Sequence, residues 1–122
     1  MTGNDRLPKL IFKIEHAQAW REAKRAGVYA GAPIDRRDGF IHFSAATQVS
    51  GTLERYFADR SDLLLIAVDT SRCGDALLWE VSRGGERFPH LYATLSMEAV
   101  VGVEPIGADG TLPNAKAWGL TA

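Results

Sequence analysis

Apolar residues along the chain recur with two different periods, which predict strands and helices in turn. Residues 10–14 alternate well enough for a buried strand in which Lys13 is the polar exception. Residues 63–68 form the most apolar run and predict a central strand. Four shorter apolar runs predict further strands, at residues 40–43, 77–81, 88–92 and 99–105.

Two helices are predicted in the first half of the chain. Residues 15–26 are rich in helix-forming residues, and Gly27 is placed to end that helix. The second helix covers about residues 45–57, with Ser44 as its N-cap. Between the helices, residues 31–39 contain many turn-forming residues and predict a loop. Apolar residues three to four positions apart give the second helix one inward face, formed by Ala45, Val49, Leu53 and Tyr56 or Phe57.

The order of these elements is strand, helix, strand, helix, and then four strands in succession. Strands that follow one another along the chain favour antiparallel pairing, so the pattern predicts an α+β fold with a largely antiparallel sheet. We place a single domain at residues 9–106. The polar start, residues 1–8, and the Gly- and Thr-containing end, residues 107–122, are expected to be flexible.

Composition excludes several classes of function. The net charge is −1, so the chain lacks the electrostatic footprint of a duplex-DNA-binding protein. No apolar run reaches about 18 residues, which argues against a membrane span. A single cysteine cannot form an internal disulfide, and a reducing, cytoplasmic location is expected. Glycine-rich phosphate loops and cysteine pairs are absent, and the three histidines are not predicted to form a metal site.

The first segment with candidate chemistry is residues 38–44. His42 and Ser44 lie two positions apart, so on a strand their side chains share a face. If Ser44 also begins a helix, the free backbone N–H groups there favour an anion such as phosphate. The segment therefore predicts a small anion- or ribose-binding corner. The alternative is a helix-capping serine beside a histidine that is hydrogen-bonded to the backbone.

The second segment, residues 80–92, is dense in polar and aromatic side chains. Glu80 lies on one predicted strand, and His90 and Tyr92 share a face of the next. Arg83 and Glu86 flank a tight turn built on paired glycines. This density favours a functional site. Solvated strand and turn charges with a half-buried tyrosine are the structural alternative.

These two segments carry a resemblance to a known family. Residues 9–105 resemble the bacterial proteins grouped as Domain of Unknown Function 952 (DUF952). Members often carry histidine where this chain has Lys13. The matching positions are 11–14, Trp20, 26–29, 38–44, 48–49, 56–57, 68–69 and the stretch 79–92.

The resemblance implies a fold similar to that of the ADP-ribosyltransferases, in which a split β-sheet holds NAD in a cleft. Residues 41–44, with the following helix and residues 65–69, are also similar to part of the NAD-dependent RNA 2′-phosphotransferases. The implied function is binding of NAD or an ADP-ribose derivative, with or without transfer or hydrolysis of ADP-ribose. A non-catalytic module for another small anionic metabolite, or a partner-binding protein, is the alternative.

The resemblance also suggests roles for individual residues. In ADP-ribosyl chemistry a carboxylate faces the positive charge that develops on the ribose, and Glu80 or Glu86 would serve as this catalytic group. The ligand itself would be bound by His42, Ser44, Arg83, His90 and Tyr92.

Overall fold

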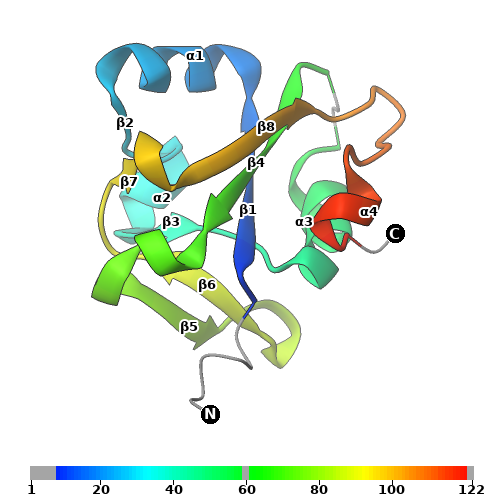
Figure 1. Ribbon diagram of the computed structural model, residues 1–122. Coiled ribbons are helices and arrows are strands. Elements are labelled where there is room, and N and C mark those ends of the chain that lie inside the picture. Colours follow the sequence, from blue (N-terminus) through cyan, green and yellow to red (C-terminus); the bar gives the residue numbers. More distant parts are fainter. Residues whose placement is uncertain (1–7, 59–60, 121–122) are drawn as a thin grey trace.

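Two three-stranded sheets meet at a single point on strand β1 (Figure 1). The computed structural model describes residues 8–58 and 61–120. One sheet has the order β1-β4-β8, formed by Leu10–His16, Leu63–Asp69 and Val100–Pro105. The other has the order β3-β6-β5, formed by Ile41–His42, Arg87–Leu91 and Leu77–Val81. A two-stranded ladder joins β2 (Val28–Tyr29) to β7 (Leu95–Ser96).

Each strand pair in the described part of the chain is antiparallel, which confirms the predicted α+β class. The six predicted strands correspond to β1, β3, β4, β5, β6 and β8, while the two-residue strands β2 and β7 were not predicted. No helix among the described residues combines the length and apolarity that crossing a membrane requires.

The junction between the sheets is a backbone bridge between Phe12 and Ser44. Each residue donates its N–H to the carbonyl oxygen of the other, at 2.8 Å in both directions. On its other side β1 pairs with β4 along its full length. In the described part of the chain β1 and β3 share no ladder, so the two sheets meet at this bridge and are split apart beyond it.

The bridge corrects the prediction that Ser44 caps a helix. Because the Ser44 N–H and carbonyl pair with Phe12, the chain is still extended there. A 3₁₀ turn, Ala46–Gln48, follows, and α3 covers only Val49–Tyr56. The Gln48 side chain accepts a hydrogen bond from the Ala45 N–H (2.9 Å) at the start of the turn.

The predicted inward face of this helix is confirmed at Val49 and Leu53, and of the two aromatic alternatives Phe57 faces the core, whereas Ala45 precedes the helix. Val49 and Leu53 are buried, whereas Tyr56 is 58% exposed. Phe57, just past the end of α3, packs against the same hydrophobic cluster as Leu53. The helix ends one residue early, so Phe57 takes the inward position that the spacing assigned to either aromatic residue.

The other helices show where local sequence signals were sufficient. α1 (Ala17–Ala26) ends as predicted at Gly27, whose φ of 86° is a left-handed conformation that favours glycine. The expected loop at residues 31–39 instead contains α2 (Pro33–Asp38). Proline in the first helical turn and Gly39 after the last residue delimit α2.

The segment after Ile106 contains more structure than its composition suggests. It forms α4 (Ala115–Trp118), and the Trp118 ring lies 5.8 Å from that of Phe12. Trp118 also covers Gly102 of β8 so closely that a Cβ there would lie 2.6 Å from the indole ring.

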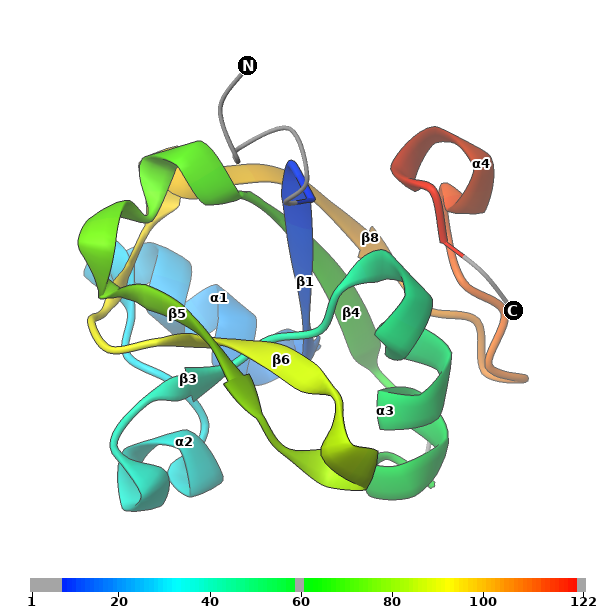
Figure 2. The ribbon, with the colours of Figure 1, turned by 90° about the horizontal axis from the view of Figure 1, so that it is seen from below.

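Side chains alternate along β1 and β4 and fill hydrophobic clusters on opposite faces of the sheet. One cluster involves α1 and the second sheet, with Ile11, Trp20, Ile41, Ile66, Val68 and Leu91. The other lies under α3, with Phe12, Ile14, Val49, Leu53, Leu65 and Ile106. Seen from below, α2 and α3 flank the second sheet on opposite sides (Figure 2). The split in the sheet lies between these two helices.

The packing of α3 predicts the cost of removing its central side chain. Leu53→Ala should lower the free energy of unfolding by roughly 2–5 kcal/mol, because it removes a buried side chain and leaves a cavity. Leu78→Ala, at a half-exposed position on β5, should cost well under that amount. Urea denaturation measures both changes. Equal losses for the two variants would show that α3 does not pack through Leu53.

Candidate functional site

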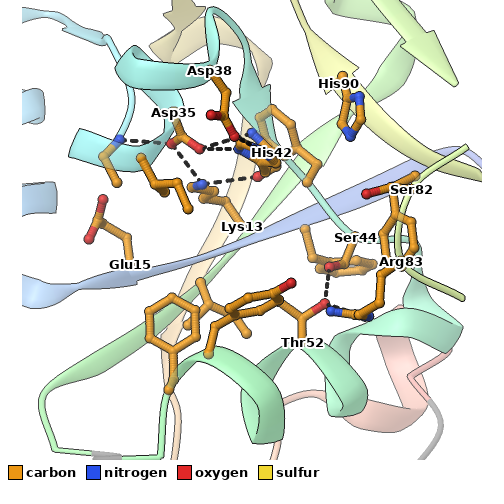
Figure 3. Close-up of a pocket in the computed structure, with 18 of the residues that line it drawn as sticks. Lys13, Glu15, Asp35, Asp38, His42, Ser44, Thr52, Ser82, Arg83 and His90 are labelled. Carbon is orange, nitrogen blue, oxygen red and sulfur yellow. Dashed lines mark hydrogen bonds and ion pairs between the residues drawn. The ribbon is translucent and has the colours of Figure 1, made fainter. Parts of the chain in front are cut away.

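A pocket of about 720 Å³ occupies the split between the sheets (Figure 3). Its wall along β1 runs from Phe12 to His16, and α2 and α3 face each other across it. Strand β6 and the turn at Ser82 and Arg83 close a further side. This volume is in the range of pockets that hold drug-sized ligands and cofactors.

A buried ionic network joins β1, α2 and β3 along one wall. The Lys13 ammonium lies 2.8 Å from Asp35 Oδ2 and donates to the His42 carbonyl at 3.0 Å. The other carboxylate oxygen of Asp35 is 2.6 Å from His42 Nδ1 and accepts the His42 N–H. Asp35 Oδ2 also accepts the Ala32 N–H at 2.7 Å, which helps to fix the start of α2.

The charge of Asp35 follows from these partners. Burial alone would raise its pKa, since the carboxylate has lost its water. Hydrogen bonds from His42 and Lys13, together with the charge of Lys13, outweigh burial and lower the pKa of Asp35 to about 2. Asp35 is therefore ionised, and it neutralises a lysine whose side chain is only 8% exposed.

Both ring nitrogens of His42 face carboxylates. Nδ1 contacts Asp35, and Nε2 lies 3.1 Å from Asp38 Oδ2. A carboxylate only accepts hydrogen bonds, so both contacts are satisfied when both nitrogens carry hydrogen. Through these two contacts, His42 on β3 is bound to α2.

A second histidine, His90, enters the pocket from β6. Its Nδ1 lies 2.7 Å from Glu80 Oε1, and the same oxygen accepts the Tyr92 hydroxyl at 2.7 Å. These hydrogen bonds, from His90 first and then from Tyr92, lower the pKa of Glu80, and the bond to Glu80 raises the pKa of Tyr92. The Phe40 ring stacks on His90 with 4.1 Å between ring centroids and lies 4.6 Å from His42.

Arg83 lines the pocket near α3. One of its terminal nitrogens donates to Thr52 Oγ1 at 3.2 Å, and Thr52 in turn bonds the Ser44 hydroxyl at 2.8 Å. The guanidinium lies over the Phe88 ring at 4.7 Å, and over the Tyr56 ring at 5.6 Å. An arginine held in this way beside hydroxyl groups is suited to binding an anionic group.

Glu15 lies at the end of the pocket opposite Arg83 in Figure 3. Its carboxylate accepts the Tyr29 hydroxyl at 2.5 Å and the His16 N–H at 2.7 Å. Burial, and then the bond to Glu15, raise the pKa of Tyr29 well above its usual range, so this phenol stays a neutral donor. Glu15 and the ion pairs Lys13–Asp35 and Arg37–Asp38 thus line one end of the pocket, and Arg83 lies at the other.

The structure brings four of the seven predicted site residues into the pocket: His42, Ser44, Arg83 and His90. Glu80 and Tyr92 lie behind His90 and do not line it. Glu86 contacts Gln48 Nε2 at 3.2 Å, also outside the lining. The predicted helix N-terminus at Ser44 is not found there, because the Ser44 N–H and carbonyl pair with Phe12 and the helical turn begins at Ala46.

Sequence reasoning missed Lys13, Glu15, Asp35 and Thr52 as residues of the pocket. A usable signal existed for Lys13, since a lysine within an apolar run must find a buried partner. Asp35 looked like an ordinary turn residue, and nothing local marks it as that partner. Within residues 8–58 and 61–120, no group of three or more His, Cys, Asp or Glu is arranged to hold a metal ion.

The Asp35 network predicts a specific acid sensitivity. Because the pKa of Asp35 falls from 3.8 to about 2 on folding, its ionised form stabilises the fold above about pH 4. About 2 kcal/mol of stability should be lost between pH 4 and pH 2. In Asp35→Asn this loss should disappear. At pH 7 the variant should be roughly 3–5 kcal/mol less stable, since Lys13 is left buried and unpaired.

Urea denaturation at pH 7, 4 and 2 measures these differences, with Asp75→Asn at an exposed position as the control. Parallel loss of stability in the wild type and Asp35→Asn below pH 4 would contradict this assignment.

Comparison with known proteins identifies the group to which the chain belongs. A family described as "Protein of unknown function (DUF952)" matches residues 14–103. Protein CC0527 from Caulobacter crescentus, known from a crystal structure, is 39% identical in sequence. The match covers 91% of this chain and 99% of the CC0527 chain, with a TM-score of 0.82. The solution structure of CC0527 covers 89% and 96%, with a TM-score of 0.74. No curated protein matches. The chain therefore belongs to the DUF952 family.

Proposed function

We propose that the protein binds NAD or an ADP-ribose derivative in the pocket between β1, α2 and α3. The observation that carries this proposal is the polarity of the pocket: Arg83 lies at one end and Glu15 at the other, across about 720 Å³. In this arrangement the diphosphate of a dinucleotide would lie against Arg83, and one of its uncharged or cationic rings would extend toward Glu15. The same resemblance that predicted the family also implies NAD in the cleft of a split sheet.

Arg83 is the proposed contact of the diphosphate. A guanidinium has five N–H donors in a planar fork that matches phosphate oxygens, and Thr52 accepts one of them. The Phe88 and Tyr56 rings keep the side chain in place, so little further ordering is needed on binding. The Thr52 hydroxyl already donates to the Gln48 carbonyl at 3.1 Å, and Ser82 also lines the pocket and supplies a further hydroxyl donor.

Aromatic and aliphatic side chains provide the surfaces against which flat rings would pack. Phe12, Phe43, Phe57 and Phe88 line the pocket together with Ile14 and Ile34. An apolar lining with a few placed polar groups is typical of cofactor sites. A nicotinamide or adenine ring would bury its faces on these residues.

Transfer of ADP-ribose through Glu80 or Glu86 has less support than binding. A carboxylate that stabilises an oxocarbenium-like ribose must face it, and neither glutamate lines the pocket. Glu15 does line it, but its two oxygens already accept bonds from Tyr29 and His16. The proposal is accordingly one of ligand binding first.

We propose a cytoplasmic location for this activity. Cys73 is half-buried, and burial, followed by the charge of Asp69, raises the pKa of its thiol. A thiol of this kind is unreactive and persists without oxidation in a reducing compartment.

Replacing Arg83, the residue proposed to bind the diphosphate, tests this function. Arg83→Met should weaken binding of ADP-ribose by roughly ten- to a hundredfold, since it removes a hydrogen-bonded charge but keeps the aliphatic stem. Arg87→Met is the matched control, because Arg87 is exposed outside the pocket and bonds the Trp79 carbonyl. Titration calorimetry with ADP-ribose, NAD and inorganic phosphate measures each affinity.

If phosphate alone binds, and ADP-ribose binds no more tightly than phosphate, the pocket is a site for another small anion. No heat from any of the three ligands at millimolar concentration would leave a partner-binding protein as the better account.

A further inference from the structure

Three histidines line the pocket, and the ring nitrogens of two of them, His42 and His90, are engaged differently. His42 has a carboxylate at each nitrogen. His90 has one, with Nδ1 at 2.7 Å from Glu80. Since Glu80 can only accept, Nδ1 carries the hydrogen, and the neutral ring keeps its lone pair on Nε2.

His90 Nε2 is accessible from the pocket. No hydrogen-bond partner contacts it within residues 8–58 and 61–120. Among those residues, Trp20 Nε1 is the fully buried side-chain polar atom that has no hydrogen-bond partner. His90 Nε2 also has no partner and is not such an atom, so it is not fully buried. Figure 3 shows the His90 ring reaching into the pocket from β6, on the side where Ser82 lies.

The ring is also held firmly in one orientation. The side chain is buried, and Phe40 stacks on its face at 4.1 Å with 26° between the planes. Tyr92 donates to the same Glu80 oxygen that faces Nδ1, which fixes the carboxylate in turn. A histidine whose one nitrogen is held by a carboxylate, and whose other nitrogen faces a cavity, has the arrangement of a general base.

We propose that His90 is the proton acceptor of the pocket and that Glu80 is its positioning residue, so that bound NAD is hydrolysed. This inference rests on the proposed function. The water oxygen forms a bond to C1′ of the nicotinamide ribose while the C1′–N bond breaks. Nicotinamide leaves with the electron pair as a neutral molecule, and the water proton passes to His90 Nε2 and then to solvent. NAD and water are the only reactants.

This assignment gives Glu80 a role that does not require it to line the pocket. As His90 gains a proton, the Glu80 carboxylate stabilises the imidazolium through Nδ1. Two titratable groups face the His90–Glu80 pair. Tyr92 carries no charge, and the ring centroid of His42 is 5.5 Å from that of His90. The His42 ring is in turn paired with Asp35 and Asp38.

The test measures nicotinamide release from NAD by the full chain, beside calorimetric binding of ADP-ribose. His90→Gln should lower kcat by about 10²–10⁴-fold, the usual contribution of a general base, with little change in affinity for ADP-ribose. Glu80→Gln should also lower kcat, by less than His90→Gln, and should move the pH at which the rate is half-maximal. Glu98→Gln, at an exposed position away from the pocket, is the matched control for the charge change and should leave both quantities unaltered.

A second measurement does not depend on turnover or on a variant that folds. The chain has three histidines. In a long-range ¹H–¹⁵N spectrum of the neutral ring, His90 should carry its hydrogen on Nδ1, and ADP-ribose should perturb its Nε2 signal. Hydrogen on Nε2 alone would overturn the assignment.

The outcomes separate the two proposals. Binding of ADP-ribose without cleavage of NAD, or undiminished cleavage by His90→Gln, overturns the role of His90 and leaves ligand binding intact. Absence of both binding and cleavage retires the two proposals together.

Discussion

The buried ion pair between Lys13 and Asp35 is the interaction on which the pocket depends. A lysine in the middle of a buried strand is tolerated only with a counter-charge, and Asp35 supplies it at 2.8 Å. Asp35 lies on α2, and its second oxygen contacts His42 on β3. One carboxylate thus determines where three elements stand along the wall of the pocket.

The same pair explains why the sheet is split. β1 bridges the segment that follows β3 at one point, between Phe12 and Ser44, and the Lys13 side chain reaches across to the His42 carbonyl. Backbone pairing is thereby replaced by a longer side-chain contact, and the strands separate.

Local patterns predicted most of the fold but little of how its parts meet. The apolar run at 63–68 and the glycine that ends α1 are local signals, and both were sufficient. The start of α3 was predicted too early, because the Phe12 bridge holds Ser44 in an extended conformation and is a contact between distant residues. The pairing of His42 with His90 across β3 and β6 likewise depends on strand register. The density of polar residues was enough to predict where the site lies. The role of each residue could not be predicted, because it depends on tertiary contacts.

His42 and His90 have different roles in the pocket, one structural and the other chemical. His42 is held by two carboxylates and stabilises the wall, while His90 keeps one nitrogen open to a ligand. The most direct test of this account is a crystal structure of the protein with ADP-ribose. The account predicts the diphosphate against Arg83 and Thr52, and the nicotinamide-side ribose near His90. ADP-ribose bound elsewhere on the molecule, or turned so that its ribose avoids His90, would contradict it.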